Sequence, residues 1–295
     1  MRLPLFSTIA PALKDKKNWL CLIAGLSLVL AYAPFSHWWL TPIALTVWLS
    51  QLDIVNSKKA RQRGFFFGLG WFSSGISWVH VSIADFGGMP LLASLALMLL
   101  LCLYLAIFPA IATYVTSCIS LSKYLNKPQH NTLQNSQTAE FNLWLMPVVW
   151  IFAEWLRGWF LTGFPWLSLG YSQIDSPLAS LAPVIGEMGI TLVLMLVAVS
   201  ITLLVQKRQI KPAILSLSLI FILTVTSKQF NWVEATGEHK KVALVQGNIA
   251  QALKWQPDQE WPTMLKYLDL TRKNYDADIV VWPESAIPAV EALSG

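Results

Sequence analysis

The chain has 295 residues, of which 55% are hydrophobic and 13% charged, and its formal net charge is +5. Soluble domains carry about 25% charged residues, and disordered chains combine low hydrophobicity with high net charge, so neither class describes the chain as a whole. The mean hydropathy of +0.52 and the pI of about 9.1 indicate instead a basic protein rich in membrane segments.

Long apolar runs separated by short polar links fill the chain from Met1 to about Val225. An α-helix needs roughly 20 apolar residues to cross a bilayer. By this measure seven membrane spans are predicted, at residues 18–34, 36–53, 64–83, 90–118, 141–158, 179–205 and 212–227. Pro109 and Pro183 lie inside the fourth and sixth spans, where proline predicts a bend. We therefore expect a polytopic α-helical membrane domain over residues 1–227, a linker over 228–240, and a different kind of domain after it.

Basic residues in the short links predict how the spans are oriented, because cytoplasmic loops are enriched in Lys and Arg. Apart from Arg157, every Lys and Arg before residue 227 lies in one alternating set of links: Arg2, Lys14, Lys16, Lys17, Lys58, Lys59, Arg61, Arg63, Lys123, Lys127, Lys207, Arg208 and Lys211. The N-terminus is therefore predicted to be cytoplasmic, and the polar tail is predicted on the opposite face. Orientation alone accounts for the basic pI, so no nucleic-acid partner is expected.

An alternative for the first span is a signal peptide, since lysines precede an apolar run that ends in Ala31-Tyr32-Ala33. Its cleavage would leave the orientation of the other spans unchanged. The cysteines, Cys21, Cys102 and Cys118, all lie in apolar runs, where free cysteine usually acts as a small buried hydrophobe. The histidines lack metal-ligand spacing, so we predict neither a metal nor a cofactor.

The polar tail is predicted to contain a strand, a helix and a second strand, at residues 241–249, 264–275 and 278–282. This order favours a parallel βαβ unit. In open α/β sheets, functional groups collect beyond the carboxyl ends of the strands, and Glu284 follows the second predicted strand by two residues. On spacing alone, a solvated loop carboxylate is the simpler interpretation of Glu284.

The residues around Glu284 carry a family resemblance. Residues 279–285 (IVVWPES) resemble the strand-plus-glutamate signature of the nitrilase, or carbon–nitrogen hydrolase, superfamily, whose domain is an α-β-β-α sandwich. Membrane spans ahead of such a domain, with residues 244–255 (LVQGNIAQALKW), are similar to the apolipoprotein N-acyltransferase family of bacterial inner membranes. Residues 78–90 (WVHVSIADFGGMP) and 154–177 (EWLRGWFLTGFPWLSLGYSQIDSP) resemble outward-facing loops of that family. The resemblance runs from about residue 18 to the last residue and implies a periplasmic C-terminal domain.

The resemblance also implies a two-step acyl transfer. A cysteine thiolate takes a fatty acyl group from a membrane phospholipid, and the α-amino group of an apolipoprotein's N-terminal diacylglyceryl cysteine then attacks the thioester. Glu284 is implied as the general base of a Glu, Lys and Cys triad. Trp255 is implied beside the acyl or lipid pocket, with packing at the membrane interface as its alternative role.

The predicted link between the fifth and sixth spans is rich in aromatic residues: Trp155, Trp159, Phe160, Phe164 and Trp166. One interpretation is a belt at the membrane interface. The other is that Phe164 and Trp166 border the route of lipid to the catalytic chamber, with Arg157 binding a phosphate. Glu154 precedes Arg157 by three residues, so a simple ion pair between them is the alternative for Arg157.

The triad's lysine and cysteine lie well downstream of this glutamate in the family, and no residue of this sequence matches them. We therefore expect an N-terminal fragment of an acyltransferase, or a truncated gene product, that is inactive by itself. Two other functions remain open: a membrane-anchored amidase or nitrilase acting on a small soluble amide, and a non-enzymatic transporter or scaffold.

Overall fold

The computed structural model describes residues 11–52, 56–125, 132–234, 236–284 and 286–287. The chain divides into two compact units, Met1–Trp232 and Val233–Gly295, and each is described by itself.

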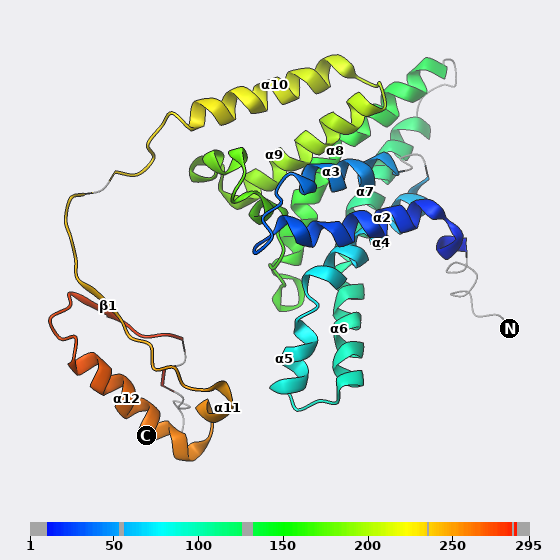
Figure 1. Cartoon of the computed structure of the whole chain (residues 1–295). Coiled ribbons are helices and arrows are strands. Elements are labelled where there is room, and N and C mark those ends of the chain that lie inside the picture. Colours follow the sequence, from blue (N-terminus) through cyan, green and yellow to red (C-terminus); the bar gives the residue numbers. More distant parts are fainter. Residues whose placement is uncertain (1–10, 53–55, 126–131, 235, 285, 288–295) are drawn as a thin grey trace. The chain divides into compact units, whose positions relative to one another are not determined.

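The first unit is built from helices joined by short links (Figure 1). Its α-helices are α2 (Lys16–Ser27), α3 (Leu40–Ser50), α4 (Ser57–Gly75), α5 (Val79–Asp85), α6 (Leu91–Leu105), α7 (Ile107–Leu125), α8 (Thr132–Arg157), α9 (Ala182–Val205) and α10 (Ile210–Ser227). Short 3₁₀ turns are η1 (Leu28–Ala31), η2 (Phe160–Thr162), η3 (Leu169–Gln173) and η4 (Pro177–Leu181).

Helices occupy the predicted membrane runs, but they differ in length. Among the described residues, three helical stretches are long and apolar enough to cross a membrane: Leu91–Ile119, Pro177–Val205 and Ile210–Ser227. The apolar helix α3 is shorter, with 11 residues. The chain thus carries membrane-type helices, while the number of seven spans remains a prediction.

The two predicted proline bends have different outcomes. Helix α6 ends at Leu105, four residues before Pro109. A proline ring clashes with the carbonyl of the residue four positions earlier, so the helix is interrupted at Leu105. Pro183 lies in the first turn of α9, where a missing N–H is tolerated. The break in α9 is instead at Gly186, with a φ of 66°, so the position of the second bend was predicted wrongly.

Close backbone contacts fix the directions of three helices. Asp15, at the start of α2, forms an ion pair of 3.8 Å with Arg63 of α4. Gly25 packs against Phe67, which lies further along both helices, so α2 and α4 are parallel. Gly68 of α4 packs against Ala106, immediately before α7, whereas the earlier Gly64 packs against Thr113 further along α7, so α4 and α7 are antiparallel. These directions agree with the alternation expected of spans one, three and four.

An aromatic core lies between α3, α4 and α8. The Trp48 and Phe67 rings stack with centroids 4.1 Å apart, and the Trp71 and Trp150 rings are 6.0 Å apart. All four side chains are buried. Trp71 and Trp150 also flank the charged residues at the end of α8, so this core supports the site described below.

The second unit confirms the predicted order of strand, helix and strand. Strands β1 (Val242–Leu244) and β2 (Ile279–Val281) pair in parallel, with Val242 opposite Ile279. Between them lie α11 (Gln251–Lys254), the turn η5 (Pro257–Gln259) and α12 (Glu260–Arg272). A small core of Val245, Tyr267 and Ala286, with Trp282 against it, joins the pieces.

Candidate functional site

Glu284 lies just beyond the carboxyl end of β2. The strand ends at Val281, so Glu284 follows it by three residues, in a turn, with an exposed side chain. The turn is anchored to α12, because Trp282 Nε1 donates to Thr271 Oγ1 at 2.8 Å and its ring lies 5.5 Å from that of Tyr267. Glu284 therefore occupies the edge of the parallel pair where catalytic groups of α/β proteins collect.

Lys254 is a residue at this edge that the sequence did not single out. Its Nζ donates to the backbone carbonyl of Glu284 at 3.2 Å. The segment after β1 therefore meets the turn after β2. The predicted parallel pairing could have revealed this contact, because both segments leave the sheet at the same edge.

Trp255 follows Lys254 and ends α11. Its side chain is 57% exposed, so it presents a large aromatic surface in the second unit. The structure thus brings the segment that carries Trp255 to the Glu284 turn, while the role of Trp255 remains a prediction.

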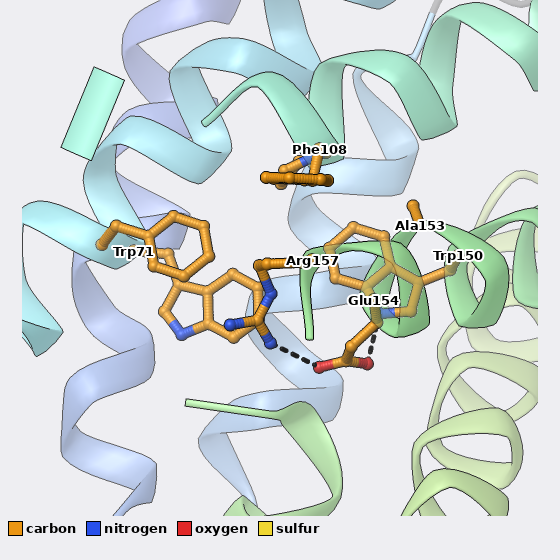
Figure 2. A pocket seen from close by; sticks show the side chains of 8 residues that line it. Trp71, Phe108, Trp150, Ala153, Glu154 and Arg157 are labelled. Atoms are coloured by element: carbon orange, nitrogen blue, oxygen red, sulfur yellow. Dashed lines mark hydrogen bonds and ion pairs between the residues drawn. The ribbon is translucent and has the colours of Figure 1, made fainter. Parts of the chain in front are cut away.

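The first unit holds a buried ion pair at the end of α8. Arg157 Nη2 lies 3.2 Å from Glu154 Oε1, and the two side chains are 3% and 4% exposed. Figure 2 shows the guanidinium facing the carboxylate between the Trp71 and Trp150 rings. The pairing that the three-residue spacing suggested is therefore present. The adjoining cavity measures only about 10 Å³, so the pair is closely packed.

Arg157 also holds the segment that follows α8. Its Nη1 donates to the carbonyls of Phe164 and Trp166, both at 2.6 Å. Its guanidinium carbon lies 5.4 Å from the centroid of the Phe72 ring, within cation–π range. The two aromatic residues predicted to meet lipid are thus tied through their backbones to the arginine predicted to meet a phosphate.

Glu154 uses both carboxylate oxygens. Oε1 accepts from Arg157 and from the Leu169 amide at 3.0 Å, and Oε2 accepts from Trp150 Nε1 at 3.1 Å. A buried carboxylate is stable only when charge and hydrogen bonds compensate its desolvation. Glu154 and Arg157 therefore form one group, the Arg157 clamp, that holds the segment after α8. Within it, Glu154 joins α8 to the start of η3.

Glu187 extends the network from α9. Its Oε1 accepts from Ser168 Oγ, from the Gly170 amide at 3.2 Å and from Thr191 Oγ1 at 3.0 Å. A Cβ on residue 170 would overlap the Glu187 carbonyl oxygen, so glycine is required for this approach. Glu187 follows the Gly186 break in α9 by one residue. Its partners lie in the aromatic link, residues 158–176 between α8 and η4, and helical spacing could not identify them.

The aromatic link contains an unusual backbone. Leu161, Thr162 and Leu167 have φ values of 50°, 72° and 61°, and Gly163 has 79°. Positive φ is costly for residues other than glycine, especially a β-branched threonine, and persists only where surrounding contacts enforce it. The Arg157 and Tyr104 hydrogen bonds to this link, the latter to the Phe160 carbonyl at 3.1 Å, supply such contacts.

A second cavity of about 320 Å³ lies beside the network. Charged lining comes from Glu154, Arg157 and Glu187, and aromatic lining comes from Trp155 and Tyr171. Phe164 and Trp166 have rings 5.1 Å apart, with Trp166 more than half exposed. The aromatic link therefore presents exposed aromatic rings beside a cluster of charged side chains, Glu154, Arg157 and Glu187.

Cys21, Cys102 and Cys118 are free and lie in the first unit. Glu284, Lys254 and Trp255 lie in the second. Each unit thus brings part of the predicted site together: the Glu284 edge in one and the Arg157 clamp with Phe164 and Trp166 in the other.

Comparisons with known proteins identify similar sequences. Residues 24–200 match the family model described as the apolipoprotein N-acyltransferase N-terminal domain. A protein of Shewanella oneidensis named apolipoprotein N-acyltransferase is 44% identical over 274 residues, which are 93% of this chain and 50% of that protein. One of the same name from Photobacterium profundum is 47% identical over 272 residues, covering 91% and 49%. A third, from Vibrio cholerae, is 44% identical over 270 residues, covering 90% and 50%. The chain spans about half the length of these curated relatives.

Proposed function

Since the chain belongs to the apolipoprotein N-acyltransferase family, we propose that it supplies the membrane part and the general-base glutamate of an enzyme that acylates apolipoproteins. The observation that carries this proposal is the family match over residues 24–200. The acyl donor is a membrane phospholipid, and the acceptor is the N-terminal diacylglyceryl cysteine of an apolipoprotein. The protein acts in the bacterial inner membrane, with the N-terminus cytoplasmic and the second unit periplasmic, as the basic links indicate.

We assign the role of general base to Glu284. Its carboxylate takes the proton of a cysteine thiol, and the thiolate attacks the ester carbonyl of the phospholipid. The tetrahedral intermediate collapses to a thioester, and the departing alkoxide takes the proton from Glu284 and leaves as a lysophospholipid. The acceptor amine then attacks the thioester and gives its proton to Glu284. The C–S bond breaks as the amide forms, and the thiolate regains the proton from Glu284. The placement of Glu284 beyond β2 supports this role.

In this proposal the thiol is not one of the chain's own cysteines, because Cys21, Cys102 and Cys118 all lie within predicted membrane spans. We therefore expect no turnover by the 295 residues alone. Purified chain incubated with phospholipid and a diacylglyceryl lipopeptide should yield no triacylated product. Product formation above the protein-free rate would overturn this expectation.

We assign the lipid-facing role to Phe164 and Trp166 in the first unit and to Trp255 in the second. Their exposed or half-buried rings offer apolar surface to acyl chains. A phosphate contact at Arg157 stays part of the proposal, but a phosphate would compete there with Glu154 and the Phe164 and Trp166 carbonyls. A structural role, holding the two aromatic residues, is what the contacts of Arg157 support directly.

A chimera tests the proposed function. This chain replaces the matched half of the Shewanella oneidensis protein, and acyl transfer to a diacylglyceryl lipopeptide is followed by mass spectrometry. We expect an active chimera, and a rate lowered about 10²- to 10⁴-fold by Glu284→Gln, the usual contribution of a general base. Glu260→Gln, in α12 of the same unit, is the matched control. An inactive chimera that is folded, or a Glu284→Gln chimera at full rate, contradicts the proposal.

A further inference from the structure

A large groove runs along α4 in the first unit, between α2 and the α6–α7 segment. Its volume is about 1200 Å³, above the roughly 300–1,000 Å³ of most small-molecule sites. It shares no lining residue with the cavity beside Glu154, Arg157 and Glu187. The groove is therefore a separate feature, and the Glu284 chemistry does not account for it.

The groove is polar at one end and apolar along the rest. Along α4, Arg61 and Gln62 come first, and Phe65, Phe66 and Leu69 follow on the same side. At a rise of 1.5 Å per residue these positions extend over roughly 12 Å. Antiparallel α7 contributes Tyr114 beside Arg61 and apolar side chains further along.

The outer wall of the groove consists of exposed apolar side chains. Leu100 and Leu103 of α6 and Ile107 and Ile111 of α7 line it, and all four are more than a third exposed. All four lie in the stretch Leu91–Ile119, which is long and apolar enough to cross a membrane. The groove is thus open along an apolar face of a stretch long enough to cross a bilayer.

Arg61 supplies the charge at the polar end of the groove. Among the residues that the structure describes, no carboxylate forms an ion pair with it, and the groove lining contains no acidic residue. Arg63, two residues on, differs because it is buried and pairs with Asp15 at 3.8 Å. Within the part of the chain that the structure describes, the groove therefore combines a cation that has no counter-charge with a long apolar surface.

We propose that this groove binds an anionic glycerophospholipid, with its phosphate at Arg61 and Gln62 and an acyl chain along Phe65, Leu69 and Ile111. A lipid is the ligand class that places an anion and a long apolar chain at this separation. The basic links put the Arg61 end at the cytoplasmic face, where anionic lipids accumulate and a basic residue near the surface contributes about 1 kcal/mol. This site is independent of the acyl-transfer proposal, because it uses no residue of that chemistry.

Native mass spectrometry of the full chain tests the site. The protein is released from nanodiscs that contain equal amounts of phosphatidylglycerol and phosphatidylcholine, and the lipids retained on each monomer are counted. We expect retained phosphatidylglycerol to exceed phosphatidylcholine. Arg61→Gln should weaken phosphatidylglycerol binding about fivefold, the factor that corresponds to the loss of one basic contact at a membrane surface.

Two matched controls separate the groove from general surface charge. Lys59→Gln removes the same charge from an exposed position of α4 outside the lining, and should retain wild-type binding. Ile111→Trp fills the groove without changing charge and should also lower retention, whereas Leu99→Trp, exposed on α6 outside the lining, should not.

Equal retention of the two lipids, or the same loss in Lys59→Gln as in Arg61→Gln, overturns the proposal. The proposal is also overturned if the chain forms a dimer without bound lipid and Ile111→Trp dissociates this dimer, because a second copy of the chain would then occupy the groove. Loss of binding in Arg61→Gln with an unchanged unfolding temperature supports it and excludes misfolding.

Discussion

At the scale of single residues, Arg157 holds the segment that follows α8 in place. One guanidinium neutralises Glu154, binds two carbonyls of the following link and packs on Phe72. Arginine suits this position because its planar fork offers several fixed donors, which the single ammonium of lysine does not. The positions of Phe164 and Trp166 thus depend on a residue that lies at the end of α8.

The buried pair predicts an asymmetric mutational response. Glu154→Leu leaves Arg157 buried without its counter-charge, and we expect it to destabilise the chain by about 3–5 kcal/mol. Adding Arg157→Met should recover part of this loss, since the uncompensated charge is gone. Denaturant unfolding in detergent micelles, followed by tryptophan fluorescence, measures both. Arg272→Met, which breaks an exposed pair of the same spacing with Asp269, is the control and should change stability little. Additive effects of the two buried substitutions would contradict the coupling.

The sequence could predict part of this cluster. Glu154 and Arg157 are one helical turn apart, so their pairing follows from helix geometry. Glu187 could not be linked to Ser168 and Gly170, which are 19 and 17 residues away in an irregular segment without periodicity. The positive φ values of Leu161 and Thr162 were equally hidden, because nothing in these residue types favours them.

At the scale of elements, α4 is the central helix because its glycines allow two neighbours to approach. Gly70 lies against Leu22 of α2, and Gly64 and Gly68 lie against the Ala106–Thr113 segment. Small residues four apart are the usual means of close helix packing in membranes, where dispersion rather than the hydrophobic effect drives association.

Gly68→Leu tests this packing. A Cβ at residue 68 would already lie 2.9 Å from Pro109 Cγ and 3.0 Å from Ala106 Cα, so a leucine must separate α4 from α7. We expect a loss of about 1–3 kcal/mol, typical of overpacking, measured as a lower unfolding temperature in micelles. Lys59→Leu adds the same side chain at an exposed position of α4 and should have little effect. Equal melting of the two variants would show that the contact is not tight.

The βαβ unit contains an ion pair that predicts a pH dependence. Lys241 donates from Nζ to Asp276, and this hydrogen bond holds the pKa of the Asp276 carboxyl below its ordinary value. A lowered folded-state pKa adds stability above the unfolded value of about 3.9, and the added stability is lost as the pH falls through the folded pKa. In Lys241→Gln we expect the Asp276 pKa to rise toward its ordinary value, measured by carboxyl ¹³C NMR on the full chain. The neighbouring exposed Lys240→Gln should leave it unchanged; equal shifts in both variants would mean general charge rather than this hydrogen bond.

The elements of this unit were predictable in type but not in extent. Short β-branched runs identified β1 and β2, yet the ladder covers three residues of each. The helix starts at Glu260, earlier than its leucine pattern indicated, because Pro262 is acceptable in a first turn whose N–H groups have no helical partner.

At the scale of the whole molecule, hydropathy identified a membrane protein, and the number of spans remains a prediction. Over the residues that the structure describes, three helical stretches meet the length and composition of a span, while the helix at the second predicted run is shorter. Hydropathy sums apolar residues across turns, so a run such as 36–53 includes residues that cap rather than extend the helix. The family, in contrast, could be recognised because its motifs are long and chemically distinctive, and the family match confirms it.

Cysteine labelling tests the predicted orientation. In a chain whose cysteines are replaced by alanine, Asp85→Cys at the end of α5 should react with a membrane-impermeant maleimide on intact spheroplasts. Lys59→Cys should react only after lysis. Both positions are exposed, so access rather than burial decides the result. The reverse pattern would place the N-terminus outside and refute the positive-inside assignment.

The position of Glu154 and Arg157 on a single helical turn has a consequence for biosynthesis. A charge without a partner costs about 2.5–3.5 kcal/mol at the centre of a membrane helix, and it adds a smaller cost in the last turn of α8, where Glu154 and Arg157 lie. Because the partners are three residues apart, the helix carries its own counter-ion, and neutralisation does not wait for any later segment to be synthesised. Helix α8 can therefore leave the translocon before α9 exists, and the link that Arg157 binds folds onto a charge pair already in place.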